Sequence, residues 1–182
     1  LYYLALSSNS MICLKSRSFI CCKNIHKLVM KDNKISHLQE NTFVGLKLLV
    51  NLLLTGNPLK IISKYGLYGL NSLSSLNMSS LNLVHIHRDA FWGLLFLTRL
   101  DISYNNISVI SPFMFTGLEG LKVLRLVENQ IRIIKMSAFD NLKNLKYLES
   151  SHNHICCFVP GIECVPSLHS TKSCISLLPS SS

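Results

Sequence analysis

Hydrophobic residues recur along the chain in one pattern of 24 positions. Repeats that begin at residues 1, 25, 49, 73, 97, 121 and 145 follow one another without insertion or deletion. The fifth reads LTRLDISYNNISVISPFMFTGLEG and the sixth reads LKVLRLVENQIRIIKMSAFDNLKN. Both fit the pattern L-x-x-L-x-L-x-x-N-x-I-x-x-I-x-x-x-x-F-x-x-L. Seven successive matches at constant spacing predict a solenoid in which each repeat forms one coil.

The alternation L-x-L in each repeat predicts a short strand with one buried face, as at Leu100 and Ile102. We expect seven such strands in parallel, the first near residues 3–7 and the others at the same place in each later repeat. An asparagine follows the strand in six repeats, and its amide can pair with backbone N–H and C=O groups of adjacent coils. These residues are Asn9, Asn33, Asn57, Asn105, Asn129 and Asn153. Repeat four has Leu81 in this slot, so we expect a local break in the asparagine ladder.

Other apolar positions predict how the rest of each coil is filled. Ile107 and Ile110 represent a pair expected in the middle of the coil. A phenylalanine column is expected on the side opposite the strand, with Leu67 as its smaller exception. Its members are Phe19, Phe43, Phe91, Phe115 and Phe139. A glycine at the next corner allows a tight return of the backbone; it is found at Gly45, Gly69, Gly93 and Gly117.

These features resemble the 24-residue leucine-rich repeats that extracellular proteins commonly use. The resemblance covers residues 1–158. It implies fold class α/β: a leucine-rich-repeat horseshoe of seven repeats with a parallel sheet on its concave face and a C-terminal cysteine cap. Each coil then buries its apolar side only against its neighbours. We divide the chain into the repeats, residues 1–155, and a cysteine-containing cap or hinge, residues 156–182.

Four cysteines stand where the repeat pattern fades, namely Cys156, Cys157, Cys164 and Cys174. Because the last coil of a solenoid needs a cap, this group predicts two disulfides formed in an oxidising compartment. Three pairings are open, and we favour Cys157–Cys164 with Cys156–Cys174. The competing interpretation is a zinc site in which His152, His154, Cys156, Cys157 and Cys164 supply the ligands. Adjacent cysteines seldom both reach one tetrahedral ion, so we expect no metal.

Three further cysteines lie in repeat one. Cys22 takes the slot of an inward leucine and is expected as a buried thiol. A Cys13–Cys21 bridge is an open alternative. No thiol is accompanied by a paired His and Asp or by a glycine-rich elbow, and no other catalytic constellation occurs. We therefore expect no enzymatic activity and no cofactor.

The tail carries a narrower resemblance. The segments ICCF, FVPGIECVP and SCISLL, within roughly residues 153–178, resemble the end of the ectodomain in leucine-rich-repeat-containing G-protein-coupled receptors, nearest the relaxin-receptor type. The resemblance implies a fragment of a cell-surface receptor at the plasma membrane, with a peptide or protein hormone as ligand. A G protein would be reached only through a membrane domain absent from this chain.

Side chains that alternate with the buried leucines of each strand predict the concave surface. The candidate ligand-binding residues are Arg99, Asp101, Val123, Arg125, Val127, Tyr147 and Glu149. Asp101, Arg125 and Glu149 alternate in sign on neighbouring strands, which favours lateral ion pairs. In relaxin-type receptors acidic pairs on this face hold hormone arginines, whereas here Arg125 lies between the acids. Val29 and Leu53 form a second, weaker candidate patch, expected to be exposed.

Composition changes this picture only in part. The net charge of +9 without a clustered basic stripe favours an acidic partner or anionic glycans over nucleic acid. Asn77 and Asn106 begin candidate glycosylation sequons. No signal peptide and no membrane-spanning run is visible, and the chain opens in mid-pattern, so we expect it to be truncated at its start. A secreted or matrix leucine-rich-repeat protein and a Toll-type receptor ectodomain, both mediating protein–protein interaction, stay open as alternatives.

Overall fold

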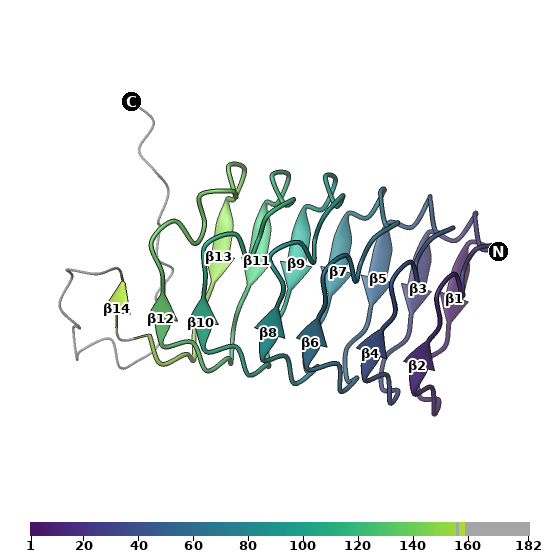
Figure 1. The fold of residues 1–182 in the computed structure, drawn as a ribbon, viewed down its shortest axis with the longest axis horizontal. Helices are drawn as coiled ribbons and strands as arrows, with labels where there is room; N and C mark the ends of the chain where they lie inside the picture. The colour runs from purple at the N-terminus through teal and green to yellow at the C-terminus, as the bar shows by residue number, and fades with distance from the viewer. Residues whose placement is uncertain (156, 159–182) are drawn as a thin grey trace.

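The computed structural model describes residues 1–155, 157 and 158, which wind into a solenoid of parallel strands (Figure 1). The main sheet contains β1 (Tyr3–Ala5), β3 (Lys27–Val29), β5 (Asn51–Leu53), β7 (Ser75–Asn77), β9 (Arg99–Asp101), β11 (Val123–Arg125) and β13 (Tyr147–Glu149). Each strand pairs in parallel with its counterpart in the next repeat, as Leu4 does with Leu28. The strands are shorter than residues 3–7 suggested, but their number and period confirm the prediction.

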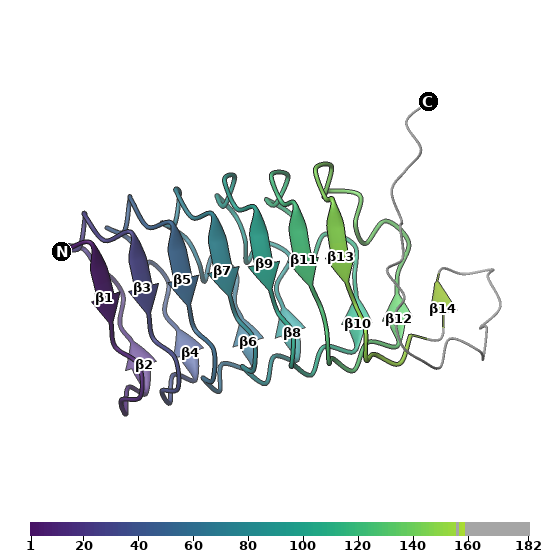
Figure 2. The same cartoon turned by 180° about the vertical axis from the view of Figure 1, so that it is seen from behind.

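A second row of two-residue strands lies on the other side of each coil, behind the main sheet in Figure 2. It consists of β2 (Cys13–Leu14), β4 (His37–Leu38), β6 (Ile61–Ile62), β8 (His85–Ile86), β10 (Val109–Ile110), β12 (Ile133–Ile134) and β14 (Cys157–Phe158). They form three small parallel sheets, β2-β4, β6-β8 and β10-β12-β14. The return from this row to the main sheet is a series of turns, and the described residues contain no helix.

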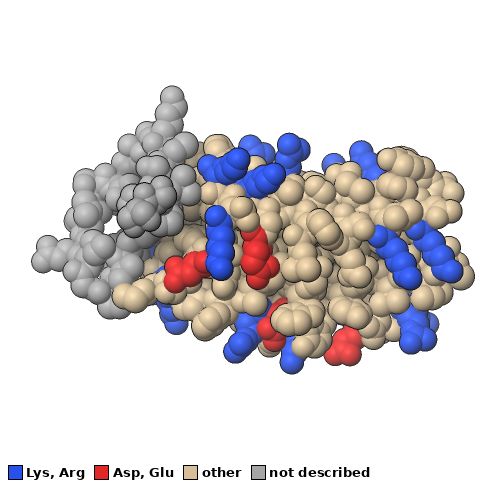
Figure 3. Space-filling model, turned by 90° about the horizontal axis from the view of Figure 1, so that it is seen from above, with Lys and Arg blue, Asp and Glu red and all other residues tan. Residues whose placement is uncertain are grey.

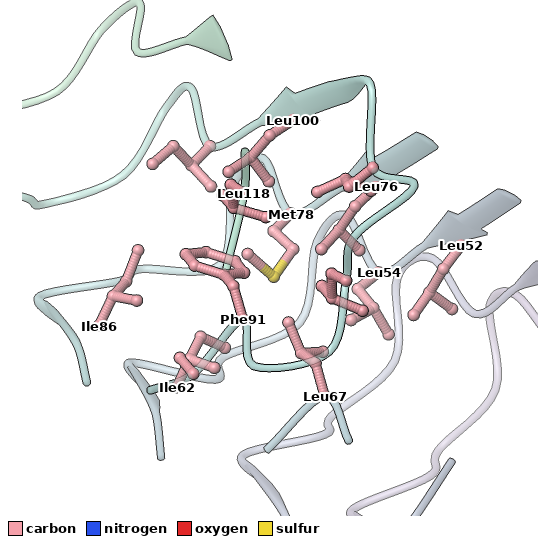
Figure 4. Close-up of a cluster of buried hydrophobic side chains, with 14 of the residues drawn as sticks. Leu52, Leu54, Ile62, Leu67, Leu76, Met78, Ile86, Phe91, Leu100 and Leu118 are labelled. Carbon is pink, nitrogen blue, oxygen red and sulfur yellow. The ribbon is translucent and has the colours of Figure 1, made fainter. Parts of the chain in front are cut away.

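The core runs as one cluster through all the described coils. Leu, Ile, Met and Phe side chains from successive repeats point into it and meet at the centre of the coil, as Met78 and Phe91 do in Figure 4. Phe19 stacks on Phe43 at 6.1 Å between ring centroids. Burying such rings removes apolar area from water, which stabilises the fold by roughly 25 cal/mol per Å² buried.

The phenylalanine column is interrupted once. A second stack joins Phe91, Phe115 and Phe139, with centroid distances of 6.5 and 6.0 Å. Leu67 lies between the two stacks in the sequence and is fully buried, as expected for the smaller member of the column. The rings therefore form two separate stacks, one in repeats one and two and the other in repeats four to six.

The buried asparagines satisfy backbone groups of neighbouring coils, as predicted. The Asn57 side chain donates through Nδ2 to the carbonyls of Met30 (2.8 Å) and Leu54 (2.6 Å). Its Oδ1 accepts from the backbone N–H of Ile35 at 3.1 Å. Asn33, Asn105, Asn129 and Asn153 repeat this arrangement. Among the described residues no buried side-chain polar atom lacks a partner.

The predicted break at Leu81 is present, and its neighbours compensate for it. Leu81 is fully buried and offers no amide. Oδ1 of Asn105 therefore accepts from two backbone N–H groups, those of Leu81 and Leu83, both at 2.9 Å. The N–H of Leu59, which an asparagine at position 81 would have served, donates to the Asn57 carbonyl at 3.0 Å. The Asn105 side chain thus accepts two backbone hydrogen bonds, whereas Asn57 accepts one.

The four corner glycines all have positive φ. At Gly45, φ is +110°, and a Cβ would lie within 2.6 Å of the Ile20 Cα in the preceding coil. Both the backbone conformation and the close approach of the coils therefore require glycine at this corner.

Cysteines of repeat one are free thiols. Cys22 is partly buried and packs against the core, which agrees with its inward slot. Cys13 and Cys21 are exposed and unbridged, so the alternative of a bridge between them is wrong. Cys13 belongs to β2, whose neighbour is β4, whereas Cys21 lies in the following turns.

A membrane-spanning helix is not found among the described residues.

Predictions about the C-terminal segment fall largely outside the described residues. Strand β14 pairs with β12 and extends the last coil to Phe158. Cys156, Cys164 and Cys174 are not described, so the two disulfides, the zinc alternative and the boundary of the cap at residue 156 stay predictions.

Candidate ligand-binding face

The outward side of the seven-stranded sheet, called the sheet face below, contains the candidate ligand-binding residues. A shallow hollow of about 350 Å³ lies on it across β7, β9, β11 and β13. Its lining consists of Ser75, Leu76, Asn77, Arg99, Leu100, Asp101, Val123, Arg125 and Tyr147. Leu76 and Leu100 are buried strand residues that belong to the core, so outward side chains of neighbouring strands form the walls of the hollow.

Five of the seven predicted residues line this hollow: Arg99, Asp101, Val123, Arg125 and Tyr147. Val127 and Glu149 do not line it. The sequence prediction omitted Ser75 and Asn77, which occupy the same outward strand slots in repeat four. Their slot was the available signal, but a small hydroxyl and an amide carry no charge or large apolar surface.

The charged side chains in the hollow differ in their hydrogen-bond and ion-pair partners. Arg125 Nε donates to Glu149 Oε2 at 2.9 Å, which confirms one of the lateral ion pairs expected from the alternating signs. Oδ1 of Asp101 instead accepts from the backbone N–H of Ser103 at 3.0 Å. The guanidinium of Arg99, an exposed residue, has no hydrogen-bond or ion-pair partner in the described part of the chain. The hollow therefore presents one unpaired guanidinium, with five donors in a fixed geometry.

Asn77 forms the polar wall on the side of the earlier repeats. Its Oδ1 accepts three hydrogen bonds, from Thr55 Oγ1 (2.8 Å), Ser79 N (2.9 Å) and Ser79 Oγ (2.8 Å). This network holds the amide oxygen toward repeat three and fixes the orientation of the side chain.

The second candidate patch, Val29 and Leu53, was predicted to be exposed, and for Val29 this is wrong. Val29 is only 8% exposed and Leu53 is half-buried. In the parallel register Ala5, Val29 and Leu53 lie side by side on one row of the sheet face. The patch therefore offers little apolar area.

The two sequons have different environments. Asn106 and Ser108 are both exposed beyond the main sheet. Ser79 is buried, and the side chain of Asn77 is held in the network described above and lines the hollow. We expect protein secreted from cells to carry a glycan on Asn106 and little or none on Asn77. Asn106→Gln should remove the mass that peptide-N-glycosidase releases, and Asn77→Gln should leave it; the reverse result would contradict this prediction.

Comparison with known proteins places the chain in a family. The model of the leucine rich repeat family matches residues 1–59 and 96–155, and the chain belongs to this family. No curated protein matches it by sequence. In the described residues the parallel solenoid is the fold of these repeats.

Solved structures give the same result. The chain is similar to TLR13 in its complex with ssRNA13, at 28% identity and a TM-score of 0.83, over 86% of this chain and 22% of that one. It is similar to Toll in the Drosophila Toll–Spatzle complex, at 26% identity and a TM-score of 0.77, over 84% and 20% of the two chains. Internalin C2 of Listeria monocytogenes matches at 26% identity and a TM-score of 0.67, over 86% and 64%.

The chain spans about a fifth of the length of the TLR13 and Toll chains. Its fold matches these receptor ectodomains and is consistent with ligand binding or protein–protein interaction.

Proposed function

We propose that this chain is a ligand-binding, non-catalytic part of an extracellular receptor and that it binds a peptide or protein on its sheet face. The observation that carries the proposal is the hollow across β7–β13 with the unpaired Arg99 in its wall. Val123 and Tyr147 add apolar and aromatic contact area to the same hollow. Arginine and tyrosine side chains contribute a large share of the binding energy in protein interfaces.

Charge in and beside the hollow favours a protein ligand over a nucleic acid. Arg99 and Arg125 are accompanied by Asp101 and Glu149, and Figure 3 shows basic and acidic side chains close together toward the C-terminal end. This part of the sheet face is therefore not a continuous basic track. A nucleic acid is bound mainly through its phosphates, which require several cations without intervening carboxylates. A protein ligand can instead match both signs, with a carboxylate facing Arg99.

Two receptor types are candidates. The Toll type is supported by the similarity to TLR13 and Toll. The relaxin-receptor type of G-protein-coupled receptor is supported by the segments ICCF, FVPGIECVP and SCISLL, which lie largely outside the described residues. The transcript that encodes this chain separates them: seven hydrophobic segments support coupling to a G protein, and one segment followed by a cytoplasmic domain supports the Toll type.

The binding proposal is tested with a panel of extracellular proteins and a random peptide library applied to the immobilised chain. Any binder is then measured against Arg99→Glu and Arg125→Glu. Each reversal is expected to weaken binding by about 1–3 kcal/mol, since a hydrogen bond to a charged group is lost. Far-ultraviolet circular dichroism should stay unchanged because both side chains are exposed.

Lys143→Glu is the matched control, because Lys143 is exposed in the turns that precede β13, away from the residues that line the hollow. Binding that survives both arginine reversals, or falls equally with the control, would show that the hollow is not the binding site.

A further inference from the structure

Exposed aromatic and aliphatic side chains gather on a second surface, in the turns that lead into β7 and β9. Trp92 is 53% exposed, Leu95 62% and Phe96 68%, and Tyr65 and Tyr68 in the preceding repeat are also exposed. The rings of Tyr65 and Trp92 meet edge to face, with centroids 6.4 Å apart. We call these five residues the aromatic edge. They form no part of the sheet-face hollow.

The regular interior of the solenoid is interrupted in the same two repeats. Leu81 breaks the asparagine ladder there and Leu67 breaks the phenylalanine column. The family match also leaves residues 60–95 uncovered. In the next two repeats the slot of Trp92 holds Thr116 and Asp140, so the repeat pattern does not require an aromatic residue there. Exposed apolar side chains that gather in adjacent repeats and meet there, as Tyr65 and Trp92 do, mark an interaction site.

Charges of opposite sign stand on the two sides of the aromatic edge. One column of slots in these turns takes the same position in each repeat and reads Lys23, Lys47, Asn71, Leu95, Glu119 and Lys143. Its two central members, Asn71 and Leu95, are uncharged and belong to the repeats that carry the aromatic edge. A two-fold axis between Asn71 and Leu95 exchanges the slots of Lys47 and Glu119.

Both of these charged residues are available for a contact. Lys47 and Glu119 are exposed, and neither has an ion-pair partner among the described residues. Their backbones are held by the following repeat: Ser72 Oγ donates to the Lys47 carbonyl and Asn144 Nδ2 to the Glu119 carbonyl, both at 2.7 Å. The two charges are therefore presented from ordered positions on either side of the aromatic edge.

We propose that the aromatic edge binds a second copy of this chain in antiparallel orientation about that two-fold axis. Trp92 of each copy then meets Tyr68 of the other, since these residues occupy the same slot in repeats four and three. Lys47 of each copy faces Glu119 of the other, so one interface contains two such pairs, as an isologous contact requires. The two attractive pairs lie next to the aromatic edge, whereas the like-charged Lys23 and Lys143, which the same axis relates, lie one repeat farther from it.

The test measures the mass of the chain by sedimentation equilibrium as a function of concentration. The parent is expected to dimerise with a dissociation constant of about 1–100 μM, the range of a small transient interface. Trp92 is the single tryptophan of the chain, so its emission should shift to shorter wavelength over the same concentration range. Lys47→Glu and Glu119→Lys should each weaken dimerisation by about tenfold or more, because each creates two like-charged pairs.

Mixing the two charge variants provides the decisive measurement. In a heterodimer of a Lys47→Glu copy and a Glu119→Lys copy both contacts are again oppositely charged. The two substituted residues face each other at one contact, and the parent Glu119 of the first copy faces the parent Lys47 of the second at the other. The mixture should therefore recover more dimer than either variant alone. The control Lys143→Glu makes the same change in net charge as Lys47→Glu, but it should dimerise at least as tightly as the parent, because the two-fold axis relates Lys143 to Lys23 and not to an acidic residue.

Three results would overturn the proposal. The first is a parent chain that remains monomeric at about 500 μM, several times the weakest dissociation constant expected. The second is a dimer that neither charge variant weakens, which would place the interface elsewhere. The third is a monomeric chain whose Trp92 emission shifts only when phosphatidylserine-containing vesicles are added, which would assign the aromatic edge to a membrane surface.

Discussion

Alanine in place of Asn105 is expected to lower the free energy of unfolding by about 3–5 kcal/mol. The Asn105 side chain is almost fully buried and makes five hydrogen bonds. Its Oδ1 serves the N–H groups of Leu81 and Leu83, and both donors would be left buried without this acceptor. Each such group costs about 1–3 kcal/mol. Urea denaturation followed by circular dichroism measures the change.

Asn9→Ala is the matched control. Asn9 holds the same slot in repeat one, but it is exposed, and its side chain donates to the carbonyls of Leu6 and Ser7 in its own repeat. Water replaces these partners, so the expected loss is less than about 1 kcal/mol. Equal losses at the two positions would show that Asn105 does not compensate for the leucine in repeat four.

Phe115→Ala is also expected to lower the free energy of unfolding by about 3–5 kcal/mol. Phe115 is fully buried and lies between Phe91 and Phe139 in the longer ring stack. Removing the ring opens a cavity that the backbone cannot close, since the coils on both sides are held by parallel strand pairing. Loss of two ring contacts adds to the cost.

Phe113→Ala is the comparison for this prediction, because Phe113 is exposed in the same repeat and its ring contacts the Arg88 guanidinium. This variant is expected to lower the free energy of unfolding by about 0.5–1 kcal/mol, the contribution of a surface cation–π contact. A Phe115→Ala chain with the parent's midpoint in urea would contradict the assignment of the ring stack to the core.

Periodicity made most of the fold predictable. A strand residue such as Leu100 and a ladder residue such as Asn57 occupy slots whose burial recurs from one repeat to the next, so one repeat informs on all the others. Outward residues follow no such rule, because their environment depends on side chains of neighbouring strands. Val29 was therefore predicted to be exposed from its outward slot, whereas it is buried.

The candidate site was predictable in position and less so in detail. Strand slots located Arg99 and Arg125, but the choice of Glu149 over Asp101 as the partner of Arg125 depends on rotamers and on the competing Ser103 N–H. The aromatic edge was not predicted. Its residues stand in turn positions where the repeat allows many side chains, and the slot that holds Tyr68 and Trp92 holds Thr116 and Asp140 in the next two repeats.

The constant spacing of the strand pairs has a consequence for how the length of this protein can change. Every strand in the main sheet pairs with the same slots of the adjacent repeats, as Leu76 does with Leu52 and Leu100. Deleting or duplicating one whole repeat brings equivalent strand positions together, so the strands at the new junction can pair as they do elsewhere in the sheet. Losing a single residue within a strand turns every later side chain of that strand to the opposite face. Whole coils are therefore the units in which such a gene can lengthen or shorten without loss of the fold.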